Sequence, residues 1–309
     1  MASGSTKAML AALFANMGIA IAKFVAYGFT GSSSMLAESI HSVADTSNQA
    51  LLLLGSKRAK QHATAEHTFG YGRERYFWSF VVALVLFTLG GLFAIYEGWH
   101  KLGDTEHGVS NVEWAIGVLV LGILLEGYSF RTAVIASRPL KGQASWWEFI
   151  RRSRTPELPV VLLEDLGALT GLVLALVGVS VAAVTGDSRW DAYGTIAIGV
   201  LLVVIATVLV FEMKSLLIGE SANRPMLKQI TAAIEGAEGI EAILDLRTQH
   251  VGPDQLLVGA EVKMDPSLDT EGVALTIDRV EARIRKAVPI ATMIYIEPET
   301  SSGDDADLA

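Results

Sequence analysis

Six apolar segments constrain the fold of this chain more than any other feature of its sequence. Each is near the ~20 residues that an α-helix needs to cross the hydrocarbon core of a bilayer. Hydrophobic residues make up 51% of the chain, and the mean hydropathy is +0.42, which is too apolar for an ordinary soluble protein. We therefore predict a membrane-embedded, all-α, six-helix transmembrane domain. The segments lie at about 8–30, 33–55, 76–100, 112–136, 158–185 and 191–213.

Basic residues indicate how these segments are oriented. Lysine and arginine gather in the loops around residues 57–75 and 138–154, whereas the loops on the opposite side hold only Lys101 and Arg189. Because positive loops stay on the cytoplasmic side of a membrane, we expect both termini to be cytoplasmic. We expect an integral protein of a bacterial plasma membrane. The chain has no cysteine, so disulfides and thiolate metal ligands are excluded.

The composition becomes typical of a soluble protein after Lys214. Apolar residues at helical spacing predict helices near 227–234 and 273–284, and runs at 240–251, 256–264 and 291–297 predict strands. The order αββαβ indicates a small α+β domain with helices on one face of the sheet. We therefore divide the chain into a transport domain at 1–215, a cytoplasmic domain at 216–299 and a disordered acidic tail at 300–309.

The second apolar segment contains a stripe of polar residues that a membrane helix rarely holds. At about 100° per residue, Glu38, His41 and Asp45 fall within roughly 60° on one helix face, and Asn48 lies beside them. Ionisable residues inside a membrane segment mark an ion pathway by default. The i, i+4 spacing of His41 and Asp45 also suits binding to one metal ion.

The fifth apolar segment contains two adjacent acids, Glu164 and Asp165. The two acids cannot both be ionised in contact with lipid, so they must face a cavity, a cation or the polar stripe of the second segment. Adjacent helical residues point about 100° apart, so one acid faces a metal more directly than the other. We expect Asp165 to be a ligand and Glu164 to be a further ligand or a proton acceptor. The alternative is a buried ion pair with Lys23 or Arg131.

Imidazole with carboxylates suits Zn²⁺, and also Fe²⁺, Co²⁺ and Mn²⁺. Such ligands must lose protons to bind a metal, so metal ions and protons compete for them. Three roles stay open for Glu38: orienting the imidazole of His41, binding the metal, or placing a charge near the membrane surface. Asn16 and Asn48 are candidates to form hydrogen bonds with the metal ligands or to take part in proton transfer.

Three strings, in combination, are specific to one family. They are 37–49 (AESIHSVADTSNQ), 70–76 (GYGRERY) and 162–165 (LLED). With the αββαβ domain, the chain resembles the cation diffusion facilitators, in their zinc-transporter-nine-like branch. The resemblance implies a homodimeric antiporter that exchanges a divalent metal, usually Zn²⁺, for protons by alternating access and exports the metal from the cytoplasm. It also implies that the cytoplasmic domain is ferredoxin-like and dimerises.

The chain departs from the family's central metal site at one position. The family's site usually has two residues from the second span and two from the fifth span, four residues apart. His41, Asp45 and Asp165 match three of these positions, but the fourth falls at Val161, which cannot bind a metal. We therefore expect Glu164 to replace it.

Two further metal sites of the family are predicted to be lost. A second histidine that often joins His67 in the loop is replaced by Tyr71. In the cytoplasmic domain, the usual histidine positions hold Leu244, Gly259 and Tyr295, which leaves Glu297. We therefore predict a metal-free dimerisation domain.

Other classes of function are weighed against transport. A membrane receptor or scaffold that binds a metal without moving it could contain the same residues, and a flux assay would distinguish the two. An enzyme is disfavoured, because no nucleophilic serine motif accompanies His41. The acidic cytoplasmic domain disfavours nucleic acid as a partner. The expected partners are a divalent cation, protons, the lipid bilayer and a second copy of the chain.

Overall fold

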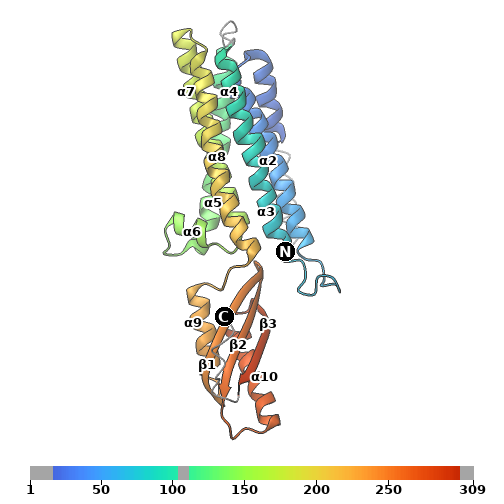
Figure 1. Cartoon of the computed structure of the whole chain (residues 1–309). Coiled ribbons are helices and arrows are strands. Elements are labelled where there is room, and N and C mark those ends of the chain that lie inside the picture. The colour runs from blue at the N-terminus through green and yellow to red at the C-terminus, as the bar shows by residue number, and fades with distance from the viewer. Residues whose placement is uncertain (1–16, 104–110, 300–309) are drawn as a thin grey trace. The chain divides into compact units, whose positions relative to one another are not determined.

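The computed structural model describes residues 17–103 and 111–299, which fold into two compact units (Figure 1). The first unit runs to Arg58 and resumes at Arg75–Lys214; the second contains Ala59–Glu74 and the chain from Ser215 onward. The predicted boundary at 215 thus leaves out a loop, 59–74, that belongs with the C-terminal unit. Gly72 of this loop lies against Val251 and Gly252, so closely that a Cβ atom at Gly72 would be 2.7 Å from the Val251 carbonyl oxygen. The predicted tail, 300–309, lies outside the described residues.

The first unit consists of helices, and α2, α3, α4, α7 and α8 run alongside one another in Figure 1. α3, η1 and α4 form one continuous helix, Glu74–Gly103. A short helix, α6, follows α5, and the side chain of Ser145 caps its first turn. The helices are Met17–Thr30, α2 (Ser33–Arg58), α3 (Glu74–Val85), η1 (Leu86–Leu92), α4 (Phe93–Gly103), α5 (Val112–Lys141), α6 (Trp146–Arg152), α7 (Glu157–Thr185) and α8 (Arg189–Ile218).

Four of the predicted spans are long and apolar enough to cross a membrane: Glu74–Gly103, α5, α7 and α8. A helical membrane domain is therefore confirmed. The 26 residues of α2 would extend for about 39 Å, but its polar residues set it apart from the other four. The first helix is described only from Met17. The count of six spans stays a prediction for these two helices.

The N-terminus of α2 is capped by an acid from a distant helix. Asp191, in the first turn of α8, is fully buried and accepts hydrogen bonds from the backbone N–H groups of Ser33 and Ser34, at 2.7 and 3.3 Å. It also accepts from the hydroxyl groups of Ser32 and Ser33, at 2.8 and 3.0 Å. The first N–H groups of a helix have no partner within it, and an acid at this end is favoured by the helix dipole. This contact fixes where α2 begins.

A π-helix, η1, interrupts the third span and lies against α2. Its two glycines permit close packing. A Cβ atom at Gly91 would be 2.6 Å from Cγ2 of Val203 on α8, and one at Gly90 would be 3.7 Å from Nδ1 of His41. Short π-helices are frequent at functional sites, and this one lies beside the predicted metal ligand His41.

The second unit has the predicted order αββαβ, so the α+β architecture is confirmed. β1 and β2 are antiparallel, β2 and β3 are parallel, and β2 is the central strand. Asn223 and Asp269 cap the two helices through their side chains. The elements are α9 (Arg224–Glu235), β1 (Ile240–Gly252), β2 (Gln255–Met264), α10 (Thr270–Ala287) and β3 (Ala291–Glu299).

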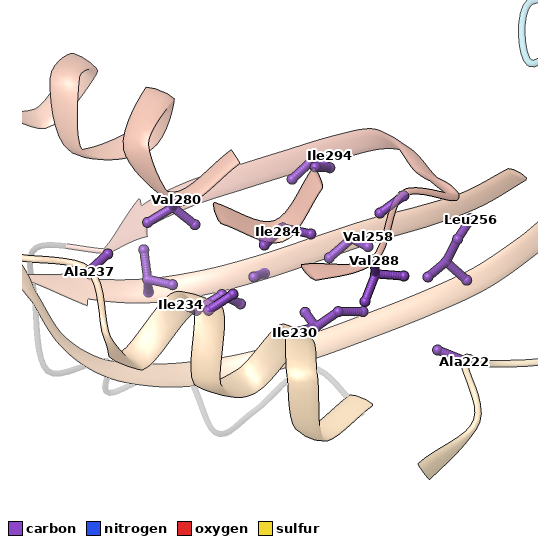
Figure 2. Packing of buried hydrophobic residues seen from close by; sticks show 14 of the residues in the cluster. Ala222, Ile230, Ile234, Ala237, Leu256, Val258, Val280, Ile284, Val288 and Ile294 are labelled. Carbon is purple, nitrogen blue, oxygen red and sulfur yellow. The ribbon is translucent and has the colours of Figure 1, made fainter. Parts of the chain in front are cut away.

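The core of this unit lies between the two helices and the sheet (Figure 2). Alternate residues of β2, from Leu256 to Met264, are buried, as expected for a strand with one covered face. They meet Ile230 and Ile234 of α9 and Val280 and Ile284 of α10, all of which are fully buried. The core therefore consists of aliphatic side chains.

Candidate metal site in the helical unit

The polar face of α2 meets one acid of α7. Asn48 donates a hydrogen bond to Oε1 of Glu164 at 2.5 Å. Nε2 of His41 lies 3.5 Å from Oδ2 of Asp45. All four residues are buried. The structure thus brings together two carboxyl groups, an imidazole and an amide from two helices.

Several donor and acceptor atoms in this group lack a hydrogen-bond partner among the described residues. They include both ring nitrogens of His41, Oδ1 of Asp45 and Oδ1 of Asn48. Burying a polar atom without a partner is costly, so such atoms suit a site whose partner is an ion, a proton or water. Nitrogen and carboxylate oxygen are the ligand atoms of Zn²⁺ in proteins.

The candidate ligand atoms do not converge on one point. Within 17–103 and 111–299, no three histidine, aspartate or glutamate side chains lie close enough together to hold a metal ion. A bound ion would therefore require side-chain movement towards a common centre, and the hydrogen bond from Asn48 to Glu164 would be exchanged for a metal contact. The donor set fits a divalent cation in its chemistry.

The structure separates the two adjacent acids of α7. Asp165 accepts a hydrogen bond from the Ser129 hydroxyl of α5 at 3.0 Å and is half-buried, whereas Glu164 is buried and reaches α2. Adjacent residues on a helix point about 100° apart, so both cannot face α2 squarely. The expectation that Asp165 is the better placed ligand is reversed in favour of Glu164, and the ligand roles themselves stay predictions.

Glu38 is paired with a lysine of the first helix. The ammonium group of Lys23 lies 3.0 Å from Oε2 of Glu38 and 2.7 Å from the hydroxyl of Ser42. Both ring nitrogens of His41 lack a hydrogen bond, so the interpretation that Glu38 orients this imidazole is wrong for this structure. Lys23 also pairs with Glu38 rather than with the acids of α7. Asn16 lies outside the described residues.

Two acids in contact with α2 or beside it were missed in the sequence. Glu126 of α5 lines a narrow crevice with Ile19, Ser42 and Asp45. An acid in the middle of the largely apolar fourth segment was the signal. Asp191, which caps α2, was also missed, although an acid at the start of the sixth segment and three consecutive serines at the start of the second are complementary.

The starts of α3 and α7 are joined by an ion pair. Arg75 donates to both carboxylate oxygens of Glu157, at 2.5 and 3.0 Å. This two-point geometry is the strongest that arginine forms with a carboxylate. In the loop before α3, the rings of His67 and Tyr71 lie 4.7 Å apart. The loss of a metal site there stays a prediction.

The positions considered for a metal site in the C-terminal unit lie in the sheet. Gly259 of β2 is in register with Tyr295 of β3, and Glu261 with Glu297. Leu244 and Tyr295 are exposed. Leu244 and Gly259 provide no side-chain ligand, so a metal-free domain stays our prediction.

Comparisons with known proteins agree with this organisation. Residues 9–218 match the family described as cation efflux transmembrane domain, and residues 223–299 match the cation efflux protein cytoplasmic domain. The human protein named proton-coupled zinc antiporter SLC30A9, mitochondrial, is 29% identical over 265 residues, which cover 85% of this chain and 46% of that protein. Metal tolerance protein C4 of Arabidopsis thaliana is 29% identical over 260 residues, which cover 84% of this chain and 57% of that protein.

The chain thus spans about half the length of these two relatives. Among solved structures, a variant of MamM-CTD is 19% identical, with a TM-score of 0.24, and the match covers 25% of this chain and 93% of that one.

Proposed function

Because the chain belongs to the cation efflux family, that of the cation diffusion facilitators, we propose that it transports a divalent metal cation across a membrane in exchange for protons. The family consists of transporters and not of enzymes. We propose Zn²⁺ as the main substrate, because the human relative is named a zinc antiporter and because imidazole with carboxylates suits Zn²⁺. Mn²⁺, Fe²⁺ and Co²⁺ are competing substrates for such ligands.

The observation that supports transport is the buried donor group of His41, Asp45 and Glu164. It joins α7, which is long and apolar enough to span a membrane, to α2. Carboxyl and imidazole groups must be free of protons at the atoms that bind a metal ion. A metal ion that binds His41, Asp45 and Glu164 would therefore displace the protons these groups carry, which couples the movement of metal to the release of H⁺.

The direction and setting of transport are part of the same proposal. We place both termini in the cytoplasm of a bacterial cell, with export of the metal through the plasma membrane by alternating access. The C-terminal unit resembles the family's cytoplasmic domain and is proposed to hold two copies of the chain together as a homodimer. The domain limits of 1–215 and 216–299 are proposed on the same basis, with the loop 59–74 grouped with the C-terminal unit.

Proteoliposomes that contain the purified chain test this function. A Zn²⁺ indicator and a pH indicator are enclosed, and a pH step is applied across the membrane. We expect Zn²⁺ movement together with proton movement in the opposite direction, and we expect Asp45→Asn to abolish both while the protein keeps its helical content. Zn²⁺ binding without flux in the unsubstituted protein would contradict transport and favour a metal-binding receptor or scaffold, an alternative that the unassembled ligands leave open.

A further inference from the structure

A lysine is completely buried in the first helix of the membrane domain. The side chains of Lys23 and Glu38 are 1% and 0% exposed, and their charged atoms lie 3.0 Å apart. The ammonium group of Lys23 also contacts the hydroxyl of Ser42 at 2.7 Å. A charge inside a membrane segment is costly and is retained where it has a partner and a function. The pair therefore requires an explanation beyond packing.

Glu38 has the chemistry and the position of a metal ligand, yet it is bound to Lys23. It lies one turn before His41 on the same face of α2. Its second oxygen, Oε1, has no hydrogen-bond partner among the described residues. That oxygen lies against Gly171 of α7, where a Cβ atom would come within 2.6 Å of it. The glycine leaves room for the carboxylate, and the lysine holds the carboxylate there.

The pair also changes the charge available to a cation. Asp45, Glu164 and Glu38 are three carboxyl groups on the facing sides of α2 and α7. Lys23 balances Glu38, which leaves Asp45 and Glu164, and two carboxylates match the charge of a divalent ion. Glu126 of α5 lines a crevice with Asp45 and with Ser42, whose hydroxyl group Lys23 contacts.

We propose that Lys23 is a positioning residue that holds Glu38 out of the coordination shell of the transported metal. With Glu38 withheld, the ion is bound by His41, Asp45 and Glu164 and can still be released. Lys23 thus acts as a tethered cation that limits how tightly the metal binds. The inference rests on the proposed function, and Lys23 acts through Glu38 without touching the metal.

Substitution of Lys23 and substitution of Glu38 should change the affinity for the metal in opposite directions. Lys23→Met frees Glu38 and removes a positive charge, so Zn²⁺ should bind about tenfold more tightly and turnover should fall because release is slower. Glu38→Gln leaves the ammonium charge near the site, so Zn²⁺ should bind about tenfold more weakly. The double variant Lys23→Met with Glu38→Gln should return to within about threefold of the unsubstituted protein.

The test measures Zn²⁺ dissociation constants by competition, and flux in proteoliposomes, for the full chain. Lys57→Met and Glu113→Gln are matched controls, because they remove the same charges from exposed positions of α2 and α5. A purely structural ion pair would weaken binding in both single variants. Shifts in the same direction, or no shift in Lys23→Met, would overturn the inference. If Glu38→Gln does not fold, equal affinities for Lys23→Met and the double variant overturn it, and about tenfold tighter binding in Lys23→Met supports it.

The two proposals fail in different ways. If the unsubstituted protein shows no proton-linked flux, or if Asp45→Asn leaves flux unchanged, the proposed function is wrong. If flux behaves as expected and the two single variants do not shift affinity in opposite directions, only the role of Lys23 is wrong.

Discussion

The polar face of α2 and the core of the C-terminal unit are both buried, but polar side chains make the contacts of the first and aliphatic side chains make those of the second. In the C-terminal unit, Ile230, Ile234, Val280 and Ile284 are fully buried against the sheet, and polar residues cap the helix ends. In α2, many of the buried residues are polar, and they bond to acids of α7 and α8 and to a lysine of the first helix.

This contrast follows from the two surroundings. In water, removing aliphatic side chains from solvent drives folding. In a bilayer, lipid chains are as apolar as leucine, so apolar contacts between helices contribute less specificity and polar contacts decide how the helices fit together. Substitutions in the two regions should therefore differ in kind as well as in size.

The largest effect is expected from Asp191→Ala. It leaves the N–H groups of Ser33 and Ser34 without their acceptor in a buried position, which should cost at least about 3 kcal/mol. Unfolding of the full chain in detergent measures this loss, and hydrogen exchange should rise first at the start of α2. Asp191→Asn, which retains one acceptor oxygen, is the control and should lose less. If both variants are as stable as the unsubstituted protein, the cap contributes little to stability.

A similar but local loss is expected from Ile284→Ala. Removing a fully buried aliphatic side chain from the core costs about 3 kcal/mol. Hydrogen exchange should increase across β2 and α9, while Zn²⁺ affinity stays within about twofold, because sites that share no contacting residues contribute additively. The exposed Leu275→Ala in the same helix is the control. A change in metal affinity would contradict the independence of the two regions.

The two adjacent acids of α7 should differ in function rather than in stability. Glu164→Gln removes a proposed ligand and should lower Zn²⁺ flux about 100-fold, whereas Asp165→Asn, which faces Ser129, should lower it less than about tenfold. Flux in proteoliposomes measures both variants, and each is the control for the other. The reverse order would restore Asp165 as the principal ligand.

The smallest effect is expected at a helix cap of the C-terminal unit. Asn223→Ala removes the side-chain acceptor for the N–H group of Met226 and should cost about 1 kcal/mol. Asn223→Asp keeps the acceptor and should be neutral or slightly stabilising. A loss as large as that of Ile284→Ala would mean that this polar contact, and not the apolar core, determines the stability of the unit.

The same contrast explains what the sequence could predict. The strand predicted at 240–251 is observed as Ile240–Gly252, and the helix near 273–284 is observed as Thr270–Ala287. Here alternation and helical spacing report directly which side is buried. The polar stripe of α2 was found in the same way, because polar residues are conspicuous in an apolar segment.

The rotation of the membrane helices could not be predicted. α7 is apolar almost throughout, so its pattern does not show which side faces α2, and the choice between Glu164 and Asp165 depends on Ser129 of a neighbouring helix. The π-helix at Leu86–Leu92 depends likewise on contacts of Gly90 and Gly91 with other helices. Such contacts are tertiary and leave no periodic signal along the chain.

The cap on α2 also bears on how the protein is made. Ser33 and its acceptor Asp191 are 158 residues apart in the chain, so α2 leaves the ribosome long before the helix that completes its hydrogen bonds. Until α8 is synthesised, the start of α2 needs water or lipid headgroups as partners. The contact that fixes the start of α2 therefore forms late in assembly. A chain truncated before Asp191 would lack the acceptor for the first turn of α2, the helix that carries His41 and Asp45.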